Sequence, residues 1–130
     1  MNLDDLELEL RNRGVRATAA RIAVYRAVSQ ATDHPGAGAI TERVRALIGT
    51  VSTQAVYDTL HALTRAGLLR QIEPAGGPAR FESRVGDNHH HMVCRSCGAV
   101  HDVECTTGSA PCLSPTDAGA FAVDEAEVTF

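Results

Sequence analysis

The sequence predicts an α+β fold in which a winged helix-turn-helix is followed by a small acidic domain built mainly of strands. Two observations predict the winged helix: four stretches with helical apolar spacing fill the first half of the chain, and a hairpin with a Gly/Pro-rich tip follows them. The third observation is a polar segment, residues 83–88, which precedes an acidic C-terminal part with three adjacent histidines and four cysteines. We therefore expect two domains, residues 1–84 and 85–130.

The four helices are indicated by their apolar spacing and their flanking residues. The first carries leucines at helical spacing and ends at Gly14, and the second begins at the N-cap residue Thr18. The third closes at Gly49. The fourth is expected over residues 53–66, after the N-cap residue Ser52, with an apolar inner face and a polar outer face.

Residues 68–73 and 79–82 are expected to form the two strands of the wing, with a turn at 74–78. Short polar groups near the start of a recognition helix can reach base edges, and arginines of a wing can reach phosphates. The alternative is an ordinary small helical domain whose polar face is merely solvated. The residues expected to contact DNA are Arg16, Arg21, Thr53, Gln54, Tyr57, Arg70 and Arg80.

The charge is distributed unevenly between the two parts. The net charge is −4, but residues 1–84 hold eleven arginines against nine acidic residues and residues 85–130 hold one arginine against seven. All twelve basic residues are arginine, which suits phosphate and guanine contacts, although a GC-rich genome would have the same effect. The chain has no apolar run long enough to cross a membrane and no signal-peptide pattern at its start, so we expect a cytoplasmic protein.

The C-terminal part is predicted to be mostly extended. Strands are expected at residues 92–93 and 99–103, joined by a turn that holds Cys94 and Cys97. Residues 106–120 are rich in small and polar residues and are expected to be irregular or weakly helical. Residues 121–130 alternate partly between apolar and polar and predict a further strand.

A metal site is predicted next to the polar segment. His89 and His91 stand two residues apart, so on a strand their imidazoles face the same side, and the intervening His90 faces the other side and has no predicted role. Nitrogen and oxygen ligands of this kind suit Fe(II), Mn(II) or Zn(II). A site with ligands from both sides of a hinge would fix the angle between the two parts. The predicted ligands are His34, Glu82, His89, His91 and Asp102.

The four cysteines leave three alternatives open. Cys94 and Cys97 have the spacing of half a zinc knuckle, and Cys105 and Cys112 could complete a four-cysteine zinc site. The same thiols could instead form disulfides as a redox switch, or they could be inert. The structural zinc is therefore an open question at this point.

Three stretches together resemble the ferric uptake regulator (Fur) family. They are residues 52–69 (Ser-Thr-Gln-Ala-Val-Tyr-Asp-Thr-Leu-His-Ala-Leu-Thr-Arg-Ala-Gly-Leu-Leu), residues 80–82 (Arg-Phe-Glu) and residues 89–98 (His-His-His-Met-Val-Cys-Arg-Ser-Cys-Gly). Within the family, the sequence resembles the actinobacterial branch that represses catalase genes and responds to peroxide. This resemblance is carried by residues 83–91, by the spacing of Cys105 and Cys112, and by residues 124–128.

The resemblance implies a homodimeric repressor, not an enzyme. Its N-terminal domain would bind an AT-rich palindromic operator in double-stranded DNA, with Tyr57 contacting bases, and its C-terminal α/β domain would dimerise. The five predicted ligands match the family's interdomain regulatory metal site, with Asp102 as the extra carboxylate of peroxide-sensing members. The targets would be catalase or other oxidative-stress genes, and the alternative is an iron-responsive repressor of metal-uptake genes. A small metalloenzyme and a zinc-storage module are the alternatives from other functional classes.

The sequence departs from the family pattern at several places. The second Cys-x-x-Cys of the family would follow Phe130, which leaves either a shortened tail or a protein that uses its thiols for redox chemistry. Asn88, Ser109 and Ala126 stand where ligands of a second metal site are expected. Asp58 occupies a recognition-helix position that is often arginine, so a different operator is expected.

Overall fold

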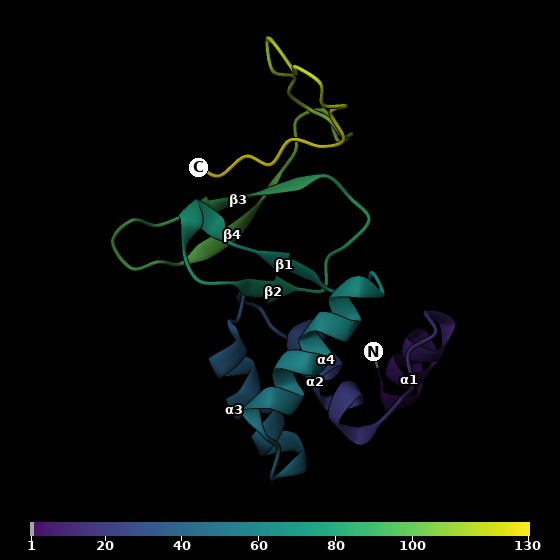
Figure 1. The fold of residues 1–130 in the computed structure, drawn as a ribbon. Coiled ribbons are helices and arrows are strands. Elements are labelled where there is room, and N and C mark those ends of the chain that lie inside the picture. The colour runs from purple at the N-terminus through teal and green to yellow at the C-terminus, as the bar shows by residue number, and fades with distance from the viewer. Residues whose placement is uncertain (1) are drawn as a thin grey trace. The chain divides into compact units, whose positions relative to one another are not determined.

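The computed structural model describes residues 2–130, which divide after Val85 into two compact units, the second of them Gly86–Phe130. Four helices and a two-stranded hairpin make up the first unit, and a second two-stranded hairpin with a long irregular segment makes up the other (Figure 1). The predicted α+β class is confirmed. None of the helices in the described part of the chain has the length and apolar character that a membrane span needs.

The helices of the first unit follow the predicted caps. Thr18 accepts a hydrogen bond from the Arg21 amide at 3.2 Å, and Ser52 accepts one from the Ala55 amide at 3.0 Å. Each cap satisfies an amide that the first turn leaves without a helical partner. The bounds are α1 Leu3–Asn12, α2 Ala19–Ser29, α3 Ala37–Ile48 and α4 Thr53–Arg65.

The core of the first unit is almost entirely aliphatic. Helix α4 buries Val56, Thr59, Leu60 and Leu63 and exposes its other face to solvent. Side chains from all four helices pack with it, and Phe81 from the hairpin joins them. The core therefore holds α4 by one face and leaves the predicted recognition face free of packing.

The wing forms as predicted but with shorter strands. Strand β1 spans Arg70–Ile72 and pairs antiparallel with β2, Arg80–Glu82, with Gln71 opposite Phe81. Residues 68–69, which we predicted to begin the first strand, are instead buried in the helical core. Two leucines gain more from packing there than from pairing at the open end of a hairpin.

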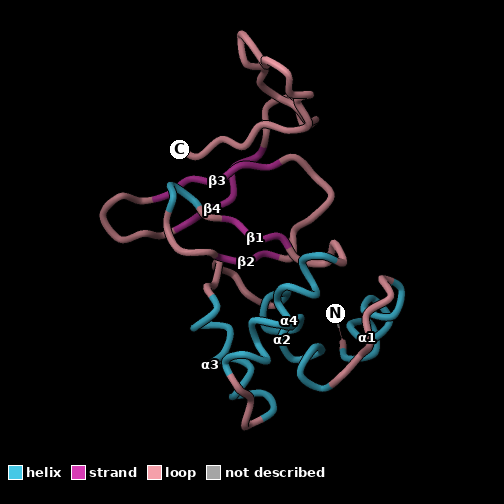
Figure 2. The backbone as a smooth tube through the Cα atoms, in the orientation of Figure 1, coloured by secondary structure: helices cyan, strands magenta, loops and turns pink. Residues whose placement is uncertain are grey.

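The second unit is built on strand β3, His89–Val93, which pairs antiparallel with β4, Val100–Glu104. The turn between them holds Cys94 and Cys97, as predicted, and it is closed by the amide of Gly98, which donates to the carbonyl of Cys94 at 2.8 Å. After β4 the chain runs through loops and turns (Figure 2).

The predicted strand over residues 121–130 is wrong over most of its length. Only its last residues contact β3: the His91 amide donates to the Val128 carbonyl at 3.2 Å, and the Phe130 amide donates to the His91 carbonyl at 2.9 Å. A strand needs backbone pairing along its length, and within the described chain the one β-bridge of this segment joins Thr129 to His91. The weak alternation of this segment was therefore a misleading signal.

Candidate functional site

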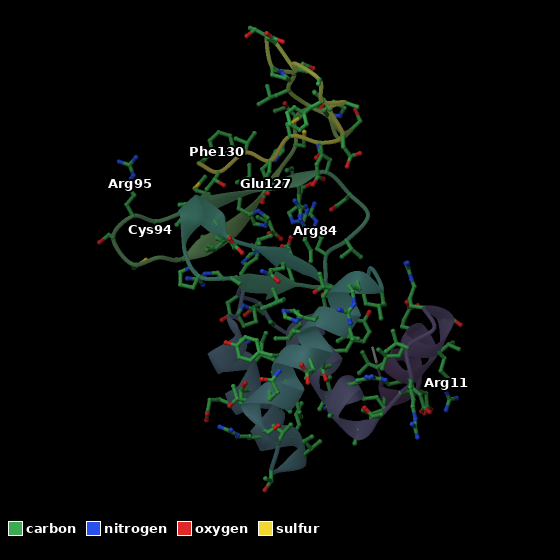
Figure 3. The ribbon with its side chains drawn as sticks, viewed as in Figure 1. Arg11, Arg84, Cys94, Arg95, Glu127 and Phe130 are labelled. Carbon is green, nitrogen blue, oxygen red and sulfur yellow. The ribbon has the colours of Figure 1, made fainter. Side chains whose placement is uncertain are left out.

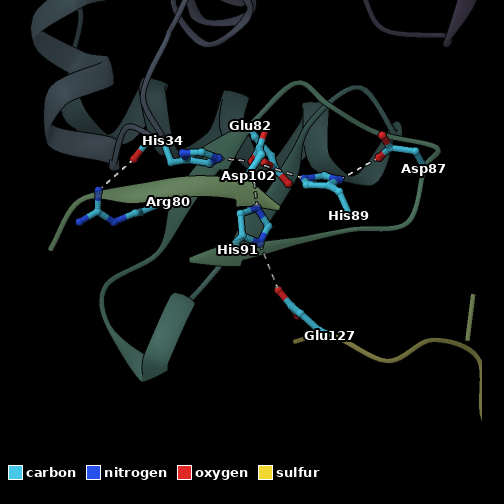
Figure 4. Close-up of polar contacts among 8 residues, drawn as sticks. All are labelled: His34, Arg80, Glu82, Asp87, His89, His91, Asp102 and Glu127. Atoms are coloured by element: carbon cyan, nitrogen blue, oxygen red, sulfur yellow. Dashed lines mark hydrogen bonds and ion pairs between the residues drawn. The ribbon is translucent and has the colours of Figure 1, made fainter. Parts of the chain in front are cut away.

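In the first unit, the loop before α3 holds His34 beside Glu82. The His34 Nε2 lies 3.3 Å from the Glu82 Oε2, and both side chains are buried, with exposed fractions of 8% and 6%. Backbone contacts fix this arrangement, because the Phe81 amide donates to the Pro35 carbonyl at 2.9 Å and Arg80 donates to the His34 carbonyl at 3.2 Å (Figure 4). The loop thus presents an imidazole and a carboxylate together.

A surface ion pair anchors the same loop on its other side. Arg43 of α3 donates to both carboxylate oxygens of Asp33, at 3.0 and 2.9 Å. This hydrogen-bonded guanidinium lowers the pKa of Asp33. A bidentate pair has a defined geometry, so it restricts the backbone next to His34.

In the second unit, two histidines of β3 face one carboxylate of β4. The ladder places His91 opposite Asp102, whose Oδ1 lies 3.5 Å from the His91 Nε2 and 3.7 Å from the His89 Nε2. The two imidazole centroids are 4.9 Å apart. The predicted alternation of the three histidines holds, and both of these side chains are buried.

Asp87 orients His89. Its Oδ1 lies 2.8 Å from the His89 Nδ1 (Figure 4). An ionised carboxylate only accepts, so Nδ1 carries the proton and Nε2 presents its lone pair toward Asp102. This is the way in which an outer carboxylate orients a metal-binding histidine. We did not predict this role from the sequence, although a carboxylate two residues before a ligand histidine is a usable signal.

Both sets of donors fit a divalent metal ion. Buried imidazole nitrogens and carboxylate oxygens, held by the fold and by an outer carboxylate, are the ligands that Fe(II), Mn(II) and Zn(II) accept. Glu127 is a further carboxylate of the second unit, with its Oε1 4.0 Å from the His91 Nδ1. It too was not among the predicted residues.

The four thiols do not gather into one site. Cys94 and Cys97 are exposed in the turn that joins β3 to β4, beside Arg95 (Figure 3). Cys105 follows the other end of β4, and five residues of strand span about 16 Å, far more than a tetrahedral zinc site allows between two sulfurs. In the part of the chain that the structure describes, the one thiol-containing group of possible ligands has its donor atoms within 4.8 Å of one another and consists of His90, Cys105 and Cys112.

The Cys94 thiol lies in an electropositive turn. Backbone N–H groups of Cys97 and then Ser96 donate to its sulfur, and they lower the pKa of Cys94. This geometry favours the thiolate, which is the form that binds zinc and reacts with oxidants. The zinc and redox interpretations of this pair both remain consistent with it.

The predicted DNA-contacting residues lie in three places. Thr53, Gln54 and Tyr57 lie on the exposed face of α4, where the Gln54 amide donates to Asp58 at 2.8 Å. Arg16 and Arg21 flank the start of α2, with Arg21 donating to the Arg16 carbonyl at 3.1 Å. The two wing arginines are half-buried: Arg70 lies on β1, and Arg80 contacts the His34 carbonyl.

Comparisons with known proteins agree with this architecture. The model of the ferric uptake regulator family matches residues 12–109. The transcriptional regulator FurA of Mycobacterium tuberculosis (strain ATCC 25618 / H37Rv) is 52% identical over 129 residues, which cover 99% of this chain and 87% of FurA. That similarity confirms the resemblance to the actinobacterial branch.

Solved structures support the same fold. The manganese-containing ferric uptake regulator of Pseudomonas aeruginosa is 29% identical, with a TM-score of 0.65 over 74% of this chain and 72% of that one. The peroxide-sensing regulator PerR of Streptococcus pyogenes is 24% identical, with a TM-score of 0.55 over 78% of this chain and 69% of that one. The chain therefore belongs to the ferric uptake regulator family of metal-responsive transcriptional regulators, and it is not an enzyme.

Proposed function

We propose that this chain is a cytoplasmic, homodimeric repressor whose binding to an operator depends on a divalent metal and is relieved by peroxide. The observation that carries the proposal is the presence of an imidazole–carboxylate donor set in each compact unit: buried His34 with buried Glu82 in one, and two buried histidines with the exposed Asp102 in the other. Residues 1–84 are the DNA-binding domain, and residues 85–130 are the dimerisation and sensing domain.

The first unit supplies the DNA contacts. The exposed face of α4 offers Gln54 and Tyr57 to base edges, and an excess of arginine over acidic residues in residues 1–84 attracts phosphates. A dimer reads two half-sites related by a two-fold axis, so the operator is a palindrome. We expect it to be AT-rich, and the Gln54–Asp58 hydrogen bond distinguishes this face from one with arginine at residue 58.

The two donor sets together bind one ion of Fe(II), Mn(II) or Zn(II) in this proposal. Neither set alone supplies four ligands, whereas His34, Glu82, His89, His91 and Asp102 supply five. An ion that takes ligands from both units favours the orientation that completes its coordination shell, and DNA affinity follows that orientation.

Peroxide is the proposed signal, and catalase or other oxidative-stress genes are the proposed targets. The similarity to FurA and the fold shared with a peroxide-sensing regulator support it. The alternative is an iron-responsive repressor of metal-uptake genes, and the name of the P. aeruginosa relative supports that reading. The two differ in the effect of peroxide at constant metal concentration.

Mobility-shift titration of the reduced, metal-loaded chain on an AT-rich palindromic duplex tests the proposal. We expect retardation that is lost with a chelator, restored by added metal, and lost again after peroxide. We expect the metal-dependent retardation to be lost in Glu82→Gln and in Asp102→Asn, which change one ligand in each unit. The exposed control Glu42→Gln should retain it. No retardation under any metal condition would refute DNA binding, and unchanged retardation after peroxide would favour the metal-uptake alternative.

Metal stoichiometry tests whether the ion is shared. Equilibrium dialysis with Mn(II) should give one ion per chain at this site, and either variant alone should remove it completely. If each variant removes a different, independent ion, the shared site is wrong even if DNA binding depends on metal. Mass spectrometry after peroxide then distinguishes an oxygen added to a ligand histidine from a loss of hydrogens at the thiols.

A further inference from the structure

His90, Cys105 and Cys112 form a cluster that the metal site does not use. His90 lies on the face of β3 opposite to its two neighbouring histidines and is buried, with 4% of its surface exposed. Its Nε2 lies 3.2 Å from the Cys112 sulfur. Both sulfurs and one nitrogen of the imidazole fall within 4.8 Å of one another.

The backbone decides which nitrogen of His90 carries the proton. The Val128 amide donates to the His90 Nδ1 at 3.2 Å, so that nitrogen accepts. The neutral imidazole then carries its proton on Nε2, which donates to the Cys112 sulfur. A metal bound at Nε2 would need the opposite tautomer, with two N–H groups facing each other at Nδ1. The cluster therefore favours thiol chemistry over metal binding.

Two polar side chains lie against the other sulfur. The Asn88 amide donates to the Cys105 sulfur and to the Ser109 carbonyl, both at 3.2 Å, and so ties the sulfur to the loop that follows it. The Thr107 hydroxyl lies 3.3 Å from the same sulfur. Contact with this hydroxyl is the largest cause that lowers the pKa of Cys105 to about 6. Cys105 is partly exposed, so a small oxidant can reach it.

We propose that Cys105 and Cys112 form a reversible disulfide when a hydroperoxide oxidises Cys105, with His90 as the residue that positions Cys112. The Cys105 thiolate attacks the peroxide: a sulfur–oxygen bond forms, the oxygen–oxygen bond breaks, and the departing oxygen takes a proton and leaves as water or an alcohol. The Cys112 sulfur then attacks the sulfenic acid, the disulfide forms, and the hydroxyl leaves as water with the thiol proton. Two thiols are oxidised and one hydroperoxide is reduced.

The surrounding chain can accommodate this bond. The two cysteines bracket residues 106–111, which contain no helix or strand, so the sulfurs can approach without breaking the β3–β4 ladder. The pair is chemically separate from Cys94 and Cys97, which lie beyond the opposite end of β4. The reaction needs no DNA and no metal, so it stands independently of the proposed function.

The test uses the full reduced chain in chelator, treated with hydrogen peroxide and then alkylated. Cleavage after Glu104 gives a peptide that begins with Cys105 and contains Cys112 but neither of the other cysteines. We expect this peptide to lose two hydrogens and its capacity for alkylation, and to regain both after thiol reduction. The double variant Cys94→Ser/Cys97→Ser should behave identically.

Single variants test the assigned roles. Cys112→Ser should leave a sulfenic acid on Cys105 that dimedone traps, and Cys105→Ser should leave Cys112 unoxidised. His90→Ala should slow disulfide formation about tenfold, and His90→Gln, which keeps an N–H donor, should restore most of the rate.

Two results would overturn the proposal. One is a peptide that stays fully alkylatable after peroxide, with oxidation confined to Cys94 and Cys97. The other is one tightly bound zinc ion per chain that is lost in both Cys105→Ser and Cys112→Ser, which would make the cluster a metal site. Either result would leave the DNA-binding test unaffected.

Discussion

Replacing Leu60 with alanine should destabilise the first unit by about 3 kcal/mol. Leu60 has no exposed surface and lies at the centre of the buried face of α4. The change removes three carbon groups, which at about 0.8 kcal/mol each cost about 2.4 kcal/mol in lost burial. The cavity that remains adds to this, and leucine-to-alanine changes in well-packed cores cost about 2–5 kcal/mol in total.

Urea unfolding followed by tyrosine fluorescence measures this effect in the first unit alone. The chain has no tryptophan, and its two tyrosines, Tyr25 and Tyr57, both lie in that unit. Leu47→Ala on α3 is the matched control: its side chain is 40% exposed, so it should cost less than about 1 kcal/mol. Equal losses in the two variants, or a loss below about 1 kcal/mol for Leu60→Ala, would refute the assignment of the inner face of α4.

Three further predictions concern the recognition helix and the thiols. Ser52→Ala removes the N-cap of α4 and should lower the free energy of unfolding by about 1 kcal/mol in the same urea assay, whereas Ser52→Gly should cost only a few tenths. Asp58→Asn removes a negative charge beside Gln54 and should tighten operator binding several-fold in low salt, with the difference shrinking as salt rises; weaker binding would contradict it. Because the pKa of Cys105 is lowered to about 6, its thiolate should be present above that pH and lost as the pH falls through it. Iodoacetamide labelling of Cys105 should therefore persist at pH 7, and Thr107→Val should move its midpoint upward; an unmoved midpoint would show that this hydroxyl is not the cause.

The helical unit was predictable because its signals are local. Caps such as Thr18 and Ser52 act within one helical turn, and apolar spacing marks the buried face over a few turns. The structure of residues 121–130 was not predictable, because a strand forms only where a distant strand has backbone groups free to pair with it. The spacing of residues in sequence does not say that only the last residues of this segment reach β3.

In the candidate site too, some contacts could be predicted from local geometry and others depend on distant residues. The alternation of the β3 histidines and the pairing of His91 with Asp102 follow from strand geometry, and both could be anticipated. The role of His90 could not, since it depends on the amide of Val128, thirty-eight residues further along the chain. Asp87 is an intermediate case. Its position two residues before His89 could be read from the sequence, but its contact with the His89 imidazole depends on the conformation of the turn before β3.

The alternation of side chains along β3 also keeps two kinds of chemistry apart. Iron, manganese and zinc all bind thiolates, so a cysteine within reach of the metal ligands would compete for the ion or be oxidised by it. Because consecutive side chains of a strand lie on opposite faces, one peptide unit separates an imidazole that we propose binds a metal from one that contacts a sulfur. A deletion of one residue in the turn before His89 that shifted the strand register would exchange the two faces of β3. His90 would then face the carboxylate of Asp102, and His89 and His91 would face the cysteines. The spacing of residues along β3 therefore matters to this arrangement as much as their identities do.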